Sequence, residues 1–186
     1  GDYKKADKEL ANKSAILSTK TRESLYVWNS LAADNQNTLL NHAPLFLKEL
    51  ELQQDIIDEF AIYDDWMDKY EHLIELGKGL PLINPELKSD DKLIKGCQSK
   101  VWLHSELEDD KVVFTADSDA IITKGIIAIL IRVFSGQHPK DIIDADTDFI
   151  DQIGLKEHLS PTRANGLVSM IKQLKMYAIA YQTQLN

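Results

Sequence analysis

The 186-residue sequence predicts an α+β fold, in which a small antiparallel three-stranded sheet packs against helices and follows a helical N-terminal extension. Two observations predict it. Three short β-rich segments lie together between residues 93 and 116, and segments with helical periodicity stand before and after them. Because helices and strands are grouped along the chain instead of alternating, an antiparallel α+β arrangement is favoured over a parallel α/β sheet.

The clearest strand signal covers residues 101–108, where side chains alternate between two faces. One face would hold Val101, Leu103, Ser105 and Leu107, and the other Trp102, His104 and Glu106. A short acidic turn, Asp109-Asp110, separates this segment from a second β-rich run at residues 111–116. Two such runs joined by a short turn predict a β-hairpin. Residues 93–95 are expected to add a short third strand.

Helical periodicity before the sheet is strongest over residues 56–74. Apolar side chains recur there at spacings of three and four residues: Ile56, Phe60, Tyr63, Met67, Tyr70 and Ile74. If the run breaks, Asp64 and Asp65 are suited to cap a second helix, and Gly77 is a candidate helix stop. Residues 79–85 contain Gly and Pro and are expected to form a turn-rich loop.

Three helical segments are expected after the sheet. Ser118 and Asp119 are candidate caps for a largely apolar, buried helix over residues 120–134, which Ser135-Gly136 would end. Pro139 can start a series of short helices. Ser160-Pro161 predicts a final helix that reaches about residue 181.

The chain divides into a helical extension, residues 1–45, and a domain over residues 46–186. In the extension, Thr21 is a candidate cap for a helix, and the Asn-rich stretch 33–41 is expected to be a connection or a helix cap. The extension suggests no function by itself.

Composition and charge argue against several classes of protein. The formal net charge is −9, and residues 51–92 hold twelve Asp or Glu against four Lys, so no basic surface is available for nucleic acid. That acidic stretch is either a solvated helical face or a docking surface for a basic partner. No apolar stretch approaches the roughly 18–20 residues of a membrane span, and no signal peptide is evident, so a cytoplasmic location is expected.

The chain has one cysteine, Cys97, which excludes an internal disulfide and a zinc site built from several thiolates. Gly96 precedes it between two β segments, so Cys97 is expected at a bend, where a thiol could be presented to another protein. Lys95, Lys100 and His104 are close enough in sequence to favour its thiolate form. The alternative is equally open at this point: a lone cysteine is often a small buried hydrophobe.

Other chemistries are poorly supported. A Cys-His hydrolase needs a histidine base with an orienting partner, and none of the five histidines forms such a signature with Cys97. An iron–sulfur scaffold normally supplies several thiolates. Gly77-Lys-Gly79 follows a helical segment, so it is not expected to be a phosphate-binding loop.

Three segments resemble the SufE family of sulfur-acceptor proteins. They are residues 64–78, residues 81–103 and residues 159–171, and the second contains the motif Gly-Cys-Gln-Ser-x-Val-Trp-Leu beginning at Gly96. Together they cover the chain from about residue 50 to its end, and residues 1–45 fall outside the family pattern.

The resemblance implies a SufE/IscU-like fold and an activity in iron–sulfur cluster assembly. A SufS-type cysteine desulfurase would hold sulfur as a persulfide, the residue matching Cys97 would accept it, and an iron–sulfur scaffold complex would receive it. Gln98 and Ser99 would support the loop. Pyridoxal phosphate would belong to the desulfurase, and no cofactor is expected on this chain. The activity is that of a carrier and desulfurase activator and not of a stand-alone catalyst.

Two further expectations accompany this resemblance. Arg163 matches an arginine of the family's late motif and is either a stabiliser of the Cys97 thiolate or persulfide, or a surface residue that organises a loop. Apolar neighbours such as Val101 and Leu103 are expected to shelter the carried sulfur. The alternative function is a docking or regulatory module for a desulfurase or scaffold that carries no sulfur.

Overall fold

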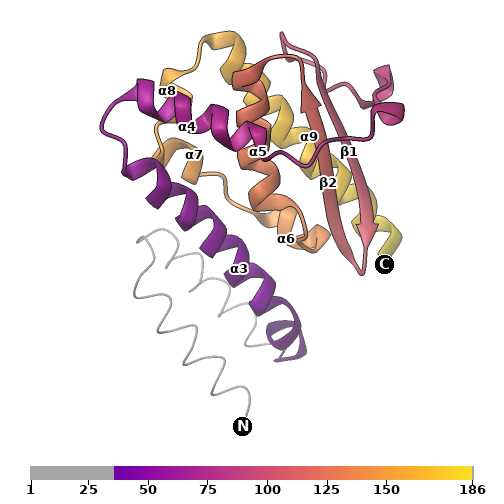
Figure 1. Cartoon of the computed structure of the whole chain (residues 1–186). Coiled ribbons are helices and arrows are strands. Elements are labelled where there is room, and N and C mark those ends of the chain that lie inside the picture. The colour runs from indigo at the N-terminus through magenta and orange to yellow at the C-terminus, as the bar shows by residue number, and fades with distance from the viewer. Residues whose placement is uncertain (1–35, 186) are drawn as a thin grey trace. The chain divides into compact units, whose positions relative to one another are not determined.

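A computed structural model describes the chain over residues 36–185, with side chains described from residue 48 onward (Figure 1). Contacts divide the chain into residues 1–54 and residues 55–186, which are described separately. The predicted helix cap at Thr21 lies outside the described residues. The proposed boundary between an extension and a domain at residue 45 stays a prediction.

Helix α3, Gln36–Ala61, includes residues 36–41, so the expected connection is wrong there, and the alternative of a helix cap falls on residues 33–35, outside the described residues. Asparagine disfavours a helix interior only mildly, and a helix that is already formed gains one hydrogen bond for each residue added. The last turns of α3 belong to the second unit, where Ile56 and Phe60 are completely buried.

Helix α4, Trp66–Lys78, confirms the predicted break and cap. The Asp65 carboxylate accepts hydrogen bonds from the backbone N–H groups of Met67, at 2.8 Å, and Asp68, at 3.0 Å. These bonds satisfy two of the donors that a helix N-terminus leaves without an intrahelical partner. The helix continues past the expected stop at Gly77 and ends one residue later, with Gly79 as its C-cap.

The predicted hairpin is confirmed. Strands β1, Val101–Glu108, and β2, Lys111–Ser118, pair antiparallel, with Val101 opposite Ser118 and Glu108 opposite Lys111. Asp109 and Asp110 both have positive φ, 46° and 63°. This is the backbone of a two-residue turn whose twist matches that of the strands, and aspartate tolerates it better than most residues do.

The expected third strand does not form, so the sheet of the described residues has two strands. Only Leu93 pairs with β1, as an isolated bridge to Trp102. The reason lies on both sides of it: the 3₁₀ turn η2, Asp90–Lys92, ends immediately before, and the bend at Gly96 follows. An earlier 3₁₀ turn, η1, covers Pro85–Leu87.

Helix α5, Ile121–Phe134, is the centre of the unit formed by residues 55–186, because it contacts α4, β2 and the C-terminal helix α9, Pro161–Leu185 (Figure 1). Ser135 and Gly136 end it, as predicted. The short helices α6, Pro139–Asp144, α7, Phe149–Gln152, and α8, Leu155–His158, connect α5 to α9. Pro139 and Pro161 stand at the first positions of their helices, as expected.

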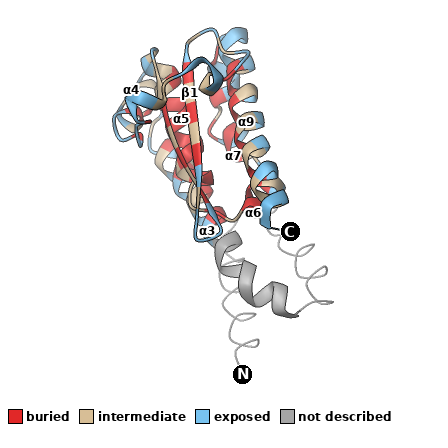
Figure 2. Ribbon diagram, turned by 90° about the vertical axis from the view of Figure 1, so that its right-hand side faces the viewer, coloured by how far each residue is buried: buried red, intermediate tan, exposed pale blue. Residues whose placement is uncertain are grey.

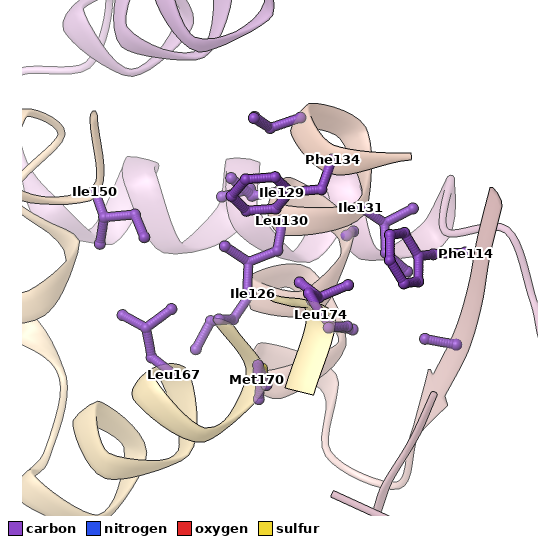
Figure 3. Packing of buried hydrophobic residues seen from close by; sticks show 14 of the residues in the cluster. Phe114, Ile126, Ile129, Leu130, Ile131, Phe134, Ile150, Leu167, Met170 and Leu174 are labelled. Carbon is purple, nitrogen blue, oxygen red and sulfur yellow. The ribbon is translucent and has the colours of Figure 1, made fainter. Parts of the chain in front are cut away.

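Buried side chains gather on α5, the hairpin and the inner face of α9 (Figure 2). In Figure 3, apolar side chains of α5 and α9 meet in one cluster, which includes Ile126, Leu130, Met170 and Leu174. None of the helices within residues 36–185 combines the length and apolar composition needed to cross a membrane.

One buried carboxyl group in this core predicts how stability depends on pH. Burial, together with the charge of Asp144, raises the pKa of Asp141 to about 6, against a smaller opposing effect of Lys140. A carboxyl whose pKa is higher in the folded state stabilises the fold at low pH and loses that contribution as pH rises from about 4 to about 6. We therefore expect the wild type to lose about 2 kcal/mol of unfolding free energy between pH 4 and pH 7 because of Asp141. Asp141→Asn should not show this loss. Urea unfolding at several pH values measures this, and parallel profiles of the two proteins would contradict it.

Candidate functional site

The loop that carries Cys97 bends at Gly96, as predicted. Gly96 has φ +92°, a conformation that side chains rarely adopt, and a Cβ atom there would lie 2.7 Å from Ser169 Oγ of α9. The bend is joined to β1 by the bond from Ile94 N to Val101 O, at 2.8 Å. The backbone conformation thus favours glycine at this position, and a larger residue would also displace the Ser169 hydroxyl.

The Cys97 side chain is half-buried against α9. Its thiol donates a hydrogen bond to Gly166 O, with Sγ 3.6 Å from the oxygen. A Cβ atom on Gly166 would lie 3.4 Å from Sγ, so the absence of a side chain on α9 leaves the room that the thiol occupies. Cys97 is therefore neither a fully buried core residue nor a freely exposed one.

A cavity of about 440 Å³ opens beside Cys97, between its loop and the first turns of α5 and α9. Arg163 lines the same cavity as Cys97, and the role that the family resemblance implies for Arg163 stays a prediction. Gln98 and Ser99 also line it. The remaining lining residues are Asp119, Ala120, Thr123, Ile126, Thr162, Gly166 and Met170.

The electrostatics of Cys97 differ from the expectation. Burial raises the pKa of the Cys97 thiol, so the protonated form is favoured in the protein as it stands. Lys95, Lys100 and His104 do not line the cavity, and His104 Nε2 lies 3.0 Å from Glu106 Oε1 on the same strand face. Proximity in sequence misled here because the direction of each side chain depends on the path of the bent loop, which the sequence does not give.

The expected shelter for the thiol also comes from other residues. Val101 and Leu103 point into the core and are completely buried, away from the cavity. The apolar part of the cavity is instead formed by Ile126 of α5 and Met170 of α9, both labelled in Figure 3. Ile126 and Met170 lie on helices that follow the hairpin, so the alternation of side chains along the strands could not identify them as neighbours of Cys97.

Two residues expected only to cap α5 hold the end of the Cys97 loop. Asp119 Oδ1 accepts a hydrogen bond from Lys100 N at 2.9 Å, and Ser118 Oγ donates one to Lys100 O at 2.9 Å. Ser118 Oγ also accepts from Ala120 N at 3.2 Å, but Ala120 is the N-cap of α5 and no side chain caps that helix, so the prediction that Ser118 or Asp119 caps it is wrong. Sequence reasoning missed the link to the loop, because a Ser-Asp pair before a helix is an ordinary capping pattern.

Comparison with known proteins identifies the family. The family model described as "SufE: Fe-S metabolism associated domain" matches residues 54–178. The chain belongs to the SufE family. A SufE-like protein of Rhizobium meliloti is 44% identical over 128 residues, which cover 66% of this chain and 91% of that protein. One of Synechocystis is 38% identical over 127 residues, covering 68% of this chain and 80% of its relative.

The fold is also similar to that of a solved structure. The solution structure of a hypothetical protein from Thermus thermophilus superposes with a TM-score of 0.61 at 19% identity, covering 71% of this chain and 96% of the other. That likeness shows the α+β fold of this SufE-family chain and nothing about its chemistry. The family places the chain in iron–sulfur metabolism, a setting consistent with sulfur transfer.

Within residues 48–185 of this SufE-family protein, no three His, Cys, Asp or Glu side chains are grouped so that they could hold a metal ion. The cavity is lined by one thiol, one guanidinium, one carboxylate, one amide and several hydroxyl groups. This arrangement suits transfer of a group to sulfur.

Proposed function

We propose that this SufE-family protein accepts a persulfide sulfur on Cys97 from a SufS-type cysteine desulfurase, stimulates that enzyme, and delivers the sulfur to an iron–sulfur scaffold complex. One observation supports the proposal: the only thiol of the chain lies on a bent loop and lines a cavity that Arg163 also lines. Location in the cytoplasm stays a prediction.

The transfer is a thiol–disulfide-type exchange. The Cys97 thiolate attacks the terminal sulfur of the partner's persulfide, a new sulfur–sulfur bond forms at Cys97, and the partner's cysteine leaves as a thiolate. Pyridoxal phosphate serves the partner's desulfurisation step and takes no part in this exchange.

The raised pKa of the thiol sets a condition on this reaction. Because burial favours the protonated form, the protein alone should react slowly, and a docked partner that lowers the pKa or moves the loop would speed the transfer. Moving the loop would break the contact between Cys97 Sγ and Gly166 O and expose the thiol. After transfer, return of the loop would place the carried sulfur beside Ile126 and Met170, away from water.

Arg163 is suited to stabilise the charged forms of Cys97. Its exposed side chain lines the cavity, and among the described residues it has no ion-pair or hydrogen-bond partner. A guanidinium near a thiolate or persulfide lowers the free energy of the anion and so lowers its pKa.

The decisive experiment mixes the protein with a SufS-type desulfurase and free cysteine and records its intact mass. We expect a gain of single sulfur atoms that is absent in Cys97→Ser, since only a thiol can form the persulfide. Wild-type protein that stays unmodified yet accelerates the desulfurase would instead show a docking module that carries no sulfur.

Arg163→Ala is expected to slow sulfur loading from the desulfurase by roughly tenfold, the effect of losing one charge-assisted interaction with the reacting sulfur. Lys172→Ala, which removes the same charge from an exposed position further along α9, is the matched control. Equal loading rates for the Arg163 variant and the control would exclude Arg163 from the site.

A further inference from the structure

Two helices begin at the cavity beside Cys97. The 14-residue helix α5 starts at Ile121, and its N-cap residue, Ala120, has no side chain that could cap the backbone N–H groups. The 25-residue helix α9 starts at Pro161 and has no acidic residue in its first turn. Ala120 and Thr162 both line the cavity. Each helix N-terminus carries about half a positive charge, so two of them favour a bound anion.

A buried hydroxyl group points independently to a ligand. Thr123 lies in the first turn of α5, is only 5% exposed, and lines the cavity. Among the residues that the structure describes, its hydroxyl has no hydrogen-bond partner. A cavity-lining hydroxyl group without a protein partner can donate a hydrogen bond to a ligand oxygen or accept one from a ligand donor.

The cavity is lined by one cationic and one anionic side chain, which balance, so the two helix N-termini give it its preference for an anion. Arg163 is the single cation among the lining residues and has no partner within the described part of the chain. Asp119 is the single carboxylate there, and one of its oxygens accepts the bond from Lys100 N. One guanidinium and two helix N-termini thus face one carboxylate that is already hydrogen-bonded.

We propose that this cavity binds thiosulfate and that Cys97 takes its outer sulfur atom. A ligand that uses both halves of the site must carry negative charge for Arg163 and the helix N-termini, and a transferable sulfur for Cys97. Thiosulfate is a small anion with both properties, and a cavity of about 440 Å³ has room for it. The inference rests on the proposed function in one respect only, namely that Cys97 accepts sulfur.

The step balances without a cofactor or an external oxidant. The Cys97 thiolate attacks the outer sulfur of thiosulfate, the bond between the two sulfur atoms of thiosulfate breaks, and sulfite leaves with the electron pair. The products are the Cys97 persulfide and sulfite, and the proton of the original thiol passes to solvent or to sulfite. Arg163 and Thr123 would hold the oxygen atoms while the outer sulfur faces Cys97 Sγ.

The test uses the full chain with thiosulfate, and with cyanide as the final acceptor, in the absence of any desulfurase or cysteine. Cyanide removes the outer sulfur of the persulfide as thiocyanate and regenerates the Cys97 thiolate, so repeated turnover is measured. We expect thiocyanate formation that is lost in Cys97→Ser and that sulfate inhibits competitively, because sulfate has the charge but no transferable sulfur. Formation no faster than with Cys97→Ser would overturn the proposal.

Two substitutions separate a binding site from a merely reactive thiol. Arg163→Gln should raise the KM for thiosulfate by roughly tenfold and Thr123→Val by a few-fold, with recovery in Thr123→Ser, as for lost hydrogen bonds to an anion. Lys172→Gln should match the wild type. Alkylation by neutral iodoacetamide shows whether Cys97 keeps its surroundings in each variant, and an unchanged KM in correctly folded Arg163 and Thr123 variants would overturn the anion site.

The two proposals can fail separately. Loading by a desulfurase without thiosulfate turnover would overturn only the thiosulfate site. Thiosulfate turnover without loading by a desulfurase would support the site and contradict the proposed partner.

Discussion

Gly125→Ala is expected to be the most destabilising small substitution in the protein, lowering the free energy of unfolding by about 3 kcal/mol or more. A Cβ atom at this position would lie 2.2 Å from Leu73 O and 2.7 Å from Leu73 Cγ. The first of these is a backbone atom of α4 and cannot rotate away, so the two helices would have to separate. Urea unfolding followed by circular dichroism measures the change.

Gly79→Ala is the matched control, because it adds the same methyl group at the end of α4. The nearest atom to its Cβ would be Leu76 O at 3.6 Å, an ordinary contact, and its φ of −86° suits alanine. We expect this variant to stay within about 0.5 kcal/mol of the wild type or to be slightly more stable. Similar stability losses for the two variants would show that α4 and α5 can separate at little cost.

The same contact explains why sequence reasoning misjudged Gly77. A glycine near the end of a helical pattern predicts a helix stop. In the structure Gly77 lies inside α4, where its Cβ would be 2.9 Å from Gly125 N. The two glycines are a pair that allows α4 and α5 to approach closely, and a pairing between residues so far apart in the chain leaves no local signal.

Elements defined by local chemistry were predicted closely. The hairpin, its Asp109-Asp110 turn and the Asp65 cap depend on residues within a few positions of one another, and all three are confirmed. The third strand was wrong because strand pairing also needs a straight backbone on both sides. The turn η2 and the Gly96 bend leave only Leu93 in register.

The residues of the candidate site also differ in how far local sequence predicts them. Cys97 and its bend were predictable, because glycine before a thiol between two β segments is a local signal. That Arg163 lines the same cavity followed only from a family resemblance, since α9 folds back from far along the chain. Thr123 was not predicted at all: a threonine in an apolar helix carries no sign that it will face a cavity, and only the packing of α5 against α9 places it there.

Gly96→Ala is expected to expose Cys97 and to raise its rate of alkylation by iodoacetamide near neutral pH by roughly tenfold, equivalent to lowering its pKa by one unit. Alanine at φ +92° is strained and its Cβ would displace the Ser169 hydroxyl, 2.7 Å away, so we expect the loop to relieve the backbone strain by moving away from α9. The thiol would then lose its contact with Gly166 O and also its burial, which is what raises its pKa.

Two variants separate the causes of this effect. Gly136→Ala introduces the same kind of strain at φ +76° but has no atom within 4 Å of the added Cβ, so it should lose about 1 kcal/mol of stability without changing Cys97 reactivity. Adding Ser169→Ala to Gly96→Ala removes the closest contact and should restore part of the slow alkylation. The prediction is contradicted if Gly96→Ala is alkylated at the wild-type rate and loses the same stability as Gly136→Ala. In that case the packing of the loop against α9 does not keep Cys97 protonated.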